Sequence, residues 1–303
     1  MEKERKKLEA ILNSNAKLKK LIVSEIREDM EKHGDDRKSP IVMREEAKAL
    51  DETELMSADP VTVVLSKKGW VRAAKGHEVD VAGLSYKAGD EYLTCALGKS
   101  NQNAIFIDST GRSYAVPAHT LPSARGQGEP LSARVSPPSG ATFEGVLMGA
   151  DTQLYLMASD AGYGFIGKLG DAQTRNKNGK AFLNLPKGAK VLPPKVVADT
   201  DSQYVVAVTN EGRMLMFPLA ELPELAKGKG NKIIGIPGAR VESREEFVID
   251  IVVLGEDNQL KIFAGKRHIG LKFSDLEHYL GERGRRGNKL PRGFQKVDGI
   301  EVV

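Results

Sequence analysis

One pattern recurs five times between Pro60 and Phe263. Each copy has an apolar strand, a short turn that ends in glycine or asparagine, and a second apolar strand. The turn residues are Gly69, Gly111, Gly162, Gly212 and Asn258, so the copies are separated by 42, 51, 50 and 46 residues. A glycine that closes a short turn supplies the positive φ angle of a bulged hairpin. The pattern predicts five hairpins, the fifth of which pairs Ile251–Leu254 with Leu260–Phe263.

This period limits the architecture. A repeat of about 40 to 50 residues with several strands per unit is typical of propeller-like domains. One unit cannot bury both faces of its small sheet, whereas units packed side by side cover each other and protect their edges. We therefore expect an all-β, propeller-like domain over residues 58–303. An ordinary β-sandwich with unrelated hairpins is the alternative, which the near-constant period disfavours.

The first thirty residues have a helical pattern instead. Apolar residues recur there at spacings of three and four, namely Leu8, Ile11, Leu12, Leu18, Leu21, Ile22, Ile26 and Met30. We expect one amphipathic helix that ends near His33, with Gly34 as the left-handed residue after it. A connector of mixed charge then completes a first region, residues 1–57. The helix cannot bury its apolar stripe alone, so we expect it to pack against another helix, further chain or a second copy.

Composition excludes several classes of site and location. A single cysteine, Cys95, allows no intrachain disulfide, and no Cys/His cluster has zinc spacing. No apolar stretch is long enough to cross a bilayer, and no signal peptide opens the chain. We expect a cytoplasmic protein without membrane insertion or a metal site. The net charge of only +4 means that any argument for nucleic acid depends on local charge clusters.

Basic, glycine-rich segments follow four of the hairpins at a similar offset. These basic loops are residues 121–128, 171–180, 222–232 and 281–289, whereas the first hairpin is followed only by Lys75-Gly76-His77. Glycine lets the backbone approach a phosphate and offers its N–H, while Lys and Arg supply charge. Along one rim of a ring, such loops suit a curved duplex better than a small ligand. The predicted DNA-binding residues are Arg125, Gln127, Arg175, Lys177, Lys180, Lys227, Lys229, Lys232, Lys266, Arg267, Arg283, Arg285, Arg286, Lys289 and Arg292.

A nucleotide-binding pattern also occurs but fits poorly. Residues 162–167 match G-x-G-x-x-G, and Lys168 extends the match towards a P-loop. Leu169 stands where Ser or Thr would bind magnesium, and the segment lies in a predicted hairpin rather than before a helix. A phosphate-loop enzyme therefore ranks behind both a DNA-binding domain and a propeller that binds proteins.

Longer stretches resemble the C-terminal region of the A subunits of bacterial topoisomerase IV, of a gammaproteobacterial type. They are residues 4–12, 34–37, 69–72, 108–115, 121–131, 156–165, 212–217, 227–234 and 281–287, and the likeness covers essentially the whole chain. The resemblance implies a five-bladed β-pinwheel related to the C-terminal domain of the gyrase A subunit, preceded by an amphipathic α-helix. Neighbouring blades of such a domain exchange a strand, and its basic rim bends DNA.

The resemblance also implies a function. The domain would engage the transported duplex for decatenation and supercoil relaxation during chromosome segregation. Gyrase carries a Gln-Arg-Arg-Gly-Gly-x-Gly box, and the nearest approach here, Gly284–Lys289, is not intact, which argues against gyrase-like negative supercoiling. We expect no catalytic residue and no cofactor in this chain, which would belong to an ATP-dependent type IIA enzyme only as part of the holoenzyme. Its Mg²⁺ and ATP would bind elsewhere.

The implied partners are duplex DNA and the topoisomerase IV B subunit, the latter through a core that precedes this chain. The helix of residues 4–33 would then be the last stretch that leads out of that core. Association with the nucleoid follows from DNA binding. A chromosome-organising condensin on the same surface, and a protein-interaction propeller as the alternative function, are left open.

Overall fold

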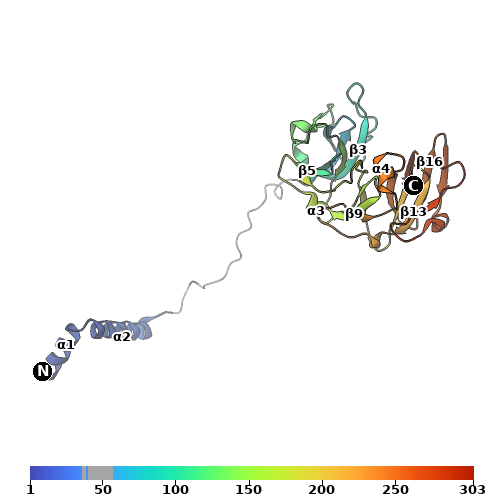
Figure 1. The fold of residues 1–303 in the computed structure, drawn as a ribbon. Coiled ribbons are helices and arrows are strands. Elements are labelled where there is room, and N and C mark those ends of the chain that lie inside the picture. Colours follow the sequence, from blue (N-terminus) through green and yellow to red (C-terminus); the bar gives the residue numbers. More distant parts are fainter. Residues whose placement is uncertain (36–38, 40–56) are drawn as a thin grey trace. The chain divides into compact units, whose positions relative to one another are not determined.

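The structure, a computed structural model, is described for residues 1–35, 39 and 57–303. It divides into two compact units, Met1–Ala49 and Leu50–Val303 (Figure 1). Most of the connector expected before Ser57 lies outside the described residues. The proposed domain boundary after Ser57 therefore stays a prediction.

The N-terminal unit has two helices where the sequence predicted one. They are α1 (Glu2–Leu12) and α2 (Asn15–His33). The prediction of an unbroken helix was wrong because Ser14 is extended, with φ −135° and ψ 102°, and begins α2 as its N-cap residue. Ser and Asn favour such positions over helix interiors. The predicted left-handed Gly34 was also wrong, since its φ is −72°.

The apolar stripe of these helices is exposed. No residue of α1 or α2 is buried, and Leu8, Leu12, Ile26 and Met30 are all more than half exposed. The two helices contact each other, and the stripe is otherwise uncovered within the described residues.

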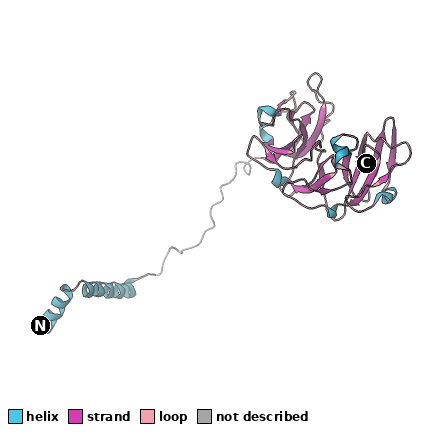
Figure 2. Cartoon of the chain, in the orientation of Figure 1, coloured by secondary structure: helices cyan, strands magenta, loops and turns pink. Residues whose placement is uncertain are grey.

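The second unit contains five small antiparallel sheets, or blades, with only short helices between them (Figure 2). Blade 1 has the strand order β3-β1-β2-β6, with β1 at Pro60–Ser66, β2 at Trp70–Lys75, β3 at Tyr92–Lys99 and β6 at Glu129–Pro130. Blade 2 has the order β10-β5-β4-β7, with β4 at Asn103–Asp108, β5 at Arg112–Pro117, β7 at Phe143–Leu147 and β10 at Lys180–Ala181. Blade 3 has the order β11-β8-β9-β14, with β8 at Leu154–Ser159, β9 at Tyr163–Lys168, β11 at Lys195–Val197 and β14 at Asn231–Lys232.

The last two blades complete the domain. Blade 4 has the order β15-β12-β13-β18, with β12 at Tyr204–Thr209, β13 at Arg213–Pro218, β15 at Val248–Leu254 and β18 at Asn288–Lys289. Blade 5 has three strands in the order β17-β16-β19, with β16 at Leu260–Ala264, β17 at Arg267–Leu271 and β19 at Gly299–Val302. The short α-helices of this unit are α3 (Leu169–Ala172), α4 (Gly238–Glu242) and α5 (Phe273–Leu276).

The fourth strand of each of blades 1 to 4 comes from the following unit. The strands β6, β10, β14 and β18 follow the hairpins of blades 2, 3, 4 and 5 in sequence but pair with β2, β5, β9 and β13 of the blade before. This topology confirms the strand exchange that the resemblance implied. It also confirms an all-β domain of five blades, preceded by helix.

The exchanged strands are fixed by a recurring backbone contact. A glycine with positive φ lies just before each exchanged strand, at positions 128, 179, 230 and 287. Three residues after each glycine comes a buried apolar residue, namely Leu131, Phe182, Ile233 and Leu290. The amide of that apolar residue then donates to the carbonyl of the preceding blade's turn glycine, as Leu131 does to Gly69 (2.9 Å) and Leu290 to Gly212 (2.8 Å). The positive φ is needed because the loop turns sharply across its neighbour. At Gly230 a Cβ would lie 2.1 Å from the carbonyl oxygen of Gly164.

Four of the predicted hairpins are confirmed and the fifth is corrected. The turn glycines 69, 111, 162 and 212 have φ angles of 76°, 80°, 78° and 67°. In the fifth unit, however, β15 pairs with β12 of blade 4, and β16 forms its hairpin with β17 through Gly265 and Lys266. Asn258 does lie in a turn, since its N–H donates to the Gly255 carbonyl, but that turn connects two blades.

The cores lie between neighbouring blades. One cluster joins Val63 and Leu65 of blade 1 to Phe106 of blade 2, and another joins Val206 of blade 4 to Leu260 of blade 5. Two further clusters join blades 2 and 3, and blades 3 and 4. The central strands are therefore covered on both faces, which explains why they are continuous apolar runs rather than alternating ones.

Candidate nucleic-acid interface

The four basic loops lie at equivalent edges of four successive sheets. Each runs into the exchanged strand of one blade, and the last three also bond to the backbone that follows the previous exchanged strand. These contacts join Ser136 N–H to the Lys177 carbonyl, Asn184 N–H to the Gly228 carbonyl and Gly284 N–H to the Ile233 carbonyl, each at 2.8 Å. The basic loops therefore form one uninterrupted series along the domain.

Most of the predicted DNA-binding side chains are exposed. The exposed ones are Arg125, Gln127, Arg175, Lys177, Lys227, Lys229, Lys266, Arg267, Arg285, Lys289 and Arg292. Among the described residues, the side chains of Arg125, Arg175, Lys177, Lys227 and Lys289 have no hydrogen-bond or ion-pair partner. These five cations are free to meet an anionic ligand, and they are spread over all four basic loops.

Two arginines of the last basic loop bond to other parts of the protein. Arg286 donates to the Gly235 carbonyl (2.9 Å) and to Oε2 of Glu246 (2.7 Å). Glu246 is fully buried and also accepts from Arg240 at 2.7 Å. Arg283 donates to the Lys232 carbonyl (2.9 Å). These two guanidinium groups hold the loop against blade 3 and α4.

The neighbouring Arg285 differs from Arg283 and Arg286 because its side chain lies at the surface. Its side chain is 74% exposed, and it pairs with Glu282 three residues earlier. An exposed pair of this kind is weak and easily exchanged for a phosphate. Of the three arginines in this loop, Arg285 is therefore the one that is available at the surface.

Several other predicted side chains have local partners. Lys180 Nζ donates to the Asp171 carbonyl (2.6 Å), and Gln127 Nε2 lies 3.5 Å from the Tyr86 carbonyl oxygen. Lys229 and Lys232 both lie over the ring of Tyr163, at 4.3 and 5.9 Å from its centroid. The cation–π contacts concentrate two positive charges at one point of blade 3.

Sequence reasoning missed a set of arginines that position the basic loops. Three arginines on the second hairpin strand of blades 1, 2 and 4 donate to carbonyl oxygens of the loop that crosses them. They are Arg72, Arg112 and Arg213, which bond to Gly126 (2.9 Å), Gly179 (3.2 Å) and Gly287 (3.2 Å). The signal was present in the sequence for Arg112 and Arg213, because each directly follows a turn glycine, but nothing local indicated their partners.

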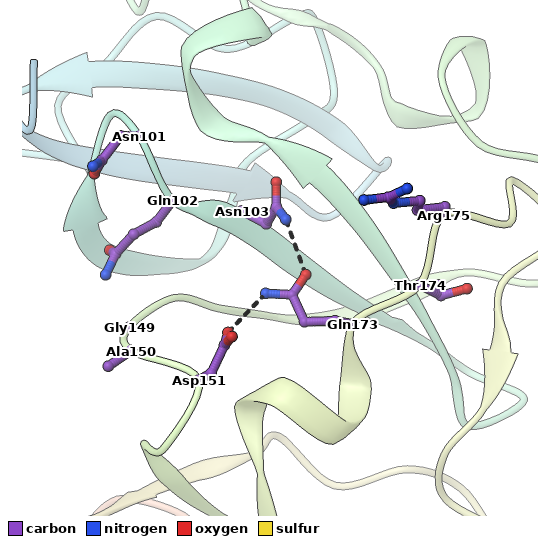
Figure 3. Close-up of a pocket in the computed structure, with 9 residues that line it drawn as sticks. All are labelled: Asn101, Gln102, Asn103, Gly149, Ala150, Asp151, Gln173, Thr174 and Arg175. Carbon is purple, nitrogen blue, oxygen red and sulfur yellow. Dashed lines mark hydrogen bonds between the residues drawn. The ribbon is translucent and has the colours of Figure 1, made fainter. Parts of the chain in front are cut away.

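An open polar hollow of about 580 Å³ lies beside Arg175 (Figure 3). Within it Asn103 donates to Gln173 Oε1 (3.0 Å), and Gln173 donates to Asp151 Oδ1 (3.3 Å). Arg175 also lines a second hollow, of about 660 Å³, whose wall includes Lys177. Arg175 therefore borders two open hollows on the surface.

Three predicted cations lie outside the basic loops. Lys266 is in the turn between β16 and β17, Arg267 begins β17, and Arg292 follows β18. All three are exposed. They gather around blade 5 rather than along the series of basic loops.

The nucleotide-binding pattern does not form a phosphate loop. Residues 162–168 belong to the β8–β9 hairpin, and only the four-residue α3 follows. Lys168 Nζ pairs with Glu224 at 2.5 Å, and this contact raises the pKa of the lysine above its ordinary value. ATP therefore has no fitting site in this segment. The described residues also contain no cluster of three His, Cys, Asp or Glu side chains that could hold a metal ion, and no described helix is long and apolar enough to cross a membrane.

Comparison with known proteins adds independent information. A family model described as the DNA gyrase C-terminal domain, β-propeller, matches residues 153–198 and 203–254. These ranges contain β8, β9 and β11 of blade 3 and β12, β13 and β15 of blade 4. The A subunit of DNA topoisomerase 4 from Pseudomonas aeruginosa is 62% identical over 99% of this chain and 40% of that protein. The Escherichia coli K12 protein of the same name is 51% identical over 100% of this chain and 40% of that protein. The solved C-terminal domain of E. coli ParC has a TM-score of 0.74 and 52% identity, over 81% of this chain and 99% of that one. The chain thus spans two fifths of the length of these curated relatives.

Proposed function

The chain belongs to the family of DNA topoisomerase IV A subunits, and from that premise we propose that its β domain binds and bends duplex DNA through the basic loops. The observation that carries this proposal is the uninterrupted series of four basic loops with unpaired cations on each. A duplex offers a long row of phosphates, which such a series matches and a small ligand does not.

The contacts are expected to be with the backbone of DNA. Exposed Lys and Arg side chains on glycine-rich loops suit phosphates, and the series offers no helix or long ribbon to enter a groove. Binding should therefore tolerate many sequences. Because the basic loops follow successive blades around the domain, a duplex that contacts all of them has to curve.

For the whole protein, we propose that this domain engages the transported duplex during decatenation and supercoil relaxation. The nucleophile, ATP and Mg²⁺ would be supplied by other parts of the complex. The B subunit would be reached through the remaining three fifths of the family's full-length chain. DNA binding would place the protein on the nucleoid, and a chromosome-organising condensin is a further partner to test.

A salt titration tests the binding proposal. The affinity of the chain for a labelled duplex of about 30 base pairs is measured by fluorescence anisotropy from about 50 to 200 mM salt. Six neutralised phosphates predict a log–log slope of about −5. A flat salt dependence, or no binding at the lowest salt, contradicts DNA binding and favours the protein-interaction alternative.

Bending has its own measurement. Donor and acceptor dyes at the two ends of the duplex should approach each other when the chain binds, and energy transfer should rise. Unchanged transfer at saturating protein would leave DNA binding in place but exclude bending. Two unrelated sequences of equal length should give the same result.

A further inference from the structure

Blade 1 has no blade before it, and no core cluster of the described residues joins it to blade 5. In units 2 to 5, the chain between the second hairpin strand and the next inner strand carries a basic loop and an exchanged strand. In unit 1 the same stretch, residues 76–91, contains no strand and lies against its own blade. Residues 76–91 are called the cap segment below.

The cap segment covers the face of blade 1 that points away from blade 2. Alternate residues of β1 belong to the core shared with blade 2, so Thr62, Val64 and Ser66 lie on the opposite face. All three are at most 2% exposed. Thr62 Oγ1 donates to the Gly76 carbonyl (2.7 Å), and Ser66 Oγ donates to Asp90 Oδ2 (2.6 Å). The cap segment therefore takes the position that a preceding blade would have.

One residue of this face is an arginine where the other blades are apolar. Three residues after the turn glycine, blades 2, 3 and 4 have Tyr114, Phe165 and Leu215, each buried in the core shared with the preceding blade. Blade 1 has Arg72 there, opposite Val64 and only 2% exposed. A buried cation is costly unless it is well bonded, and Arg72 makes no ion pair among the described residues.

Arg72 connects the cap segment to the first basic loop, residues 121–128. Its Nη1 donates to the Ser85 carbonyl of the cap segment (2.7 Å) and to the Gly126 carbonyl of the loop (2.9 Å). Its guanidinium group also lies 4.4 Å from the centroid of the Tyr86 ring. Gln127 Nε2 of the loop lies 3.5 Å from the Tyr86 carbonyl oxygen. One buried side chain therefore bonds to both segments.

The charge of the cap segment opposes a direct contact with DNA. Residues 76–91 include four acidic residues and one lysine, whereas each of the four basic loops has more cations than acids. An anionic segment repels the phosphate backbone. An effect of the cap segment on DNA binding therefore has to pass through the loop that it contacts.

We propose that the cap segment replaces a preceding blade and, through Arg72, holds the first basic loop in the conformation that binds the duplex. Arg125, which is exposed and has no side-chain partner among the described residues, then meets phosphates from a fixed loop. Fixing a loop before binding raises affinity because less conformational freedom is lost in the complex. The functional part of this inference rests on the proposed DNA binding, whereas the link between cap segment and loop is a property of the protein alone.

The first measurement needs no DNA. Hydrogen exchange of the 303-residue chain, followed by mass spectrometry, reports how often residues 121–128 open. Arg72→Leu introduces the residue type that blade 4 has at this position, Leu215, and removes both hydrogen bonds. We expect exchange in residues 121–128 to become at least about tenfold faster, from the loss of a charged hydrogen bond. Exchange in the basic loop of residues 171–180 should stay unchanged.

A variant of the cap segment tests the same link from the other side. Tyr86→Ala removes the ring that lies over the guanidinium group, whereas Tyr86→Phe keeps the ring and loses only the hydroxyl bond to the Val81 carbonyl (2.6 Å). We expect Tyr86→Ala to speed exchange in residues 121–128 by about threefold to tenfold and Tyr86→Phe by less than about twofold. This pair decides the question even if Arg72→Leu does not fold.

The functional part is tested by the affinity for the labelled duplex. In the parent chain, we expect Arg72→Leu to weaken binding by about threefold to tenfold. In a chain that already carries Arg125→Gln and Gln127→Ala, it should change the affinity by less than about twofold, because that loop no longer contributes. In a chain with Arg175→Gln and Lys177→Gln, the full loss should remain, since the effects of distant sites add.

Three outcomes would overturn the proposal. They are unchanged exchange of residues 121–128 in Arg72→Leu and Tyr86→Ala, faster exchange with unchanged duplex affinity, and an equal loss of affinity in all three chains. The last outcome would place the effect of Arg72 outside the first basic loop. If the chain binds no duplex in the salt titration, the proposed function fails, and the exchange measurements still decide whether the cap segment holds the loop.

Discussion

Two basic loops of similar composition use their charges in opposite ways. In the loop of residues 171–180, Arg175 and Lys177 are exposed and have no side-chain partner among the described residues. In the loop of residues 281–289, Arg283 and Arg286 donate to carbonyl oxygens of the neighbouring segment, and Arg286 also pairs with the buried Glu246. The first loop leaves two cations free at the surface, whereas the second uses two arginines to fix its own conformation.

The difference shows that a basic, glycine-rich segment is not by itself a measure of ligand contact. The glycines of both loops have a structural role in strand exchange, as the positive φ angles of Gly179 and Gly287 indicate. What distinguishes the loops is the presence of a buried carboxylate opposite one of them. Variants that separate fold stability from DNA affinity therefore test the comparison directly.

The largest expected effect is on stability, at Glu246. Glu246→Ala should lower the free energy of unfolding by about 3 kcal/mol, because it leaves Arg240 and Arg286 without their shared buried acceptor. Urea denaturation followed by circular dichroism measures the change. Arg285→Ala, in the same loop but exposed, should cost less than about 0.5 kcal/mol. Equal stability of Glu246→Ala and the parent protein would contradict a structural role for the ion cluster.

The next effect is at the glycines of strand exchange. Gly230→Ala should cost about 2 kcal/mol, because its φ is +74° and the new Cβ would meet the Gly164 carbonyl oxygen at 2.1 Å. Gly126→Ala is the matched control, since its Cβ would meet only the Ser123 carbonyl oxygen, at 4.0 Å. Thermal unfolding should separate the two variants clearly. Similar melting temperatures would mean that the loop relaxes without cost.

The turn glycines give a graded series of stability changes. Valine at Gly111, Gly162 or Gly212 should cost more stability than valine at Gly69, because a Cβ at the first three meets a backbone carbonyl at 2.0 to 2.7 Å. At Gly69 it meets only the Phe143 side chain, at 3.2 Å. Duplex affinity, measured where each variant is still folded, should be unchanged. Reduced affinity at parental stability would give these turns a direct DNA contact.

The comparison between the two loops is tested most directly by paired neutralisation. Arg175→Gln with Lys177→Gln should reduce the salt slope of duplex binding by about 2 and leave stability unchanged. Arg283→Gln with Arg286→Gln should instead lower the free energy of unfolding, because both side chains bond within the protein. Salt titrations and urea curves on both double variants measure the two quantities. If both pairs lower affinity alike at full stability, the distinction between the loops is wrong.

The smallest effect concerns the pH dependence of blade 1, where Asp90 accepts hydrogen bonds that hold the segment between β2 and β3. Burial raises the pKa of this carboxyl, but hydrogen bonds from Ser66 Oγ and from the backbone N–H of Lys68 and Glu91 outweigh it, so the pKa is lowered overall from 3.8. A lowered folded-state pKa contributes stability above the unfolded value, which is lost as pH falls through the folded value. The stability difference between the parent and Asp90→Asn should therefore shrink below about pH 4. A constant difference down to about pH 3 would contradict this role.

Much of the fold could be predicted because its signals are local. The turn glycines at 69, 111, 162 and 212 are readable from a few neighbouring residues, and their spacing revealed the repeat. The fifth hairpin was assigned wrongly for the same reason. The run Val248–Leu254 resembles the first strand of a hairpin, while the true turn at Gly265 and Lys266 is too short to match the longer pattern of the other four.

The remaining features depend on contacts between distant residues. The exchanged strands have only two residues each, so they carry no periodicity that could reveal them. Arg285 and Arg286 are adjacent in sequence, and their roles differ because Arg286 bonds to Gly235 and Glu246, 51 and 40 residues away. The positions of the basic loops were predicted well, whereas the use of each charge could not be.

The exchange of strands also has a consequence for how such a domain is made and how it changes in evolution. A blade is complete only after the next hairpin has been synthesised, so on the ribosome each unit would wait for its successor before it closes. A deletion cut at blade boundaries would remove the closing strand of the blade that remains. The segment that can be duplicated or lost without such damage runs from one hairpin to the next. Gene rearrangements that respect that boundary could change the number of blades one at a time.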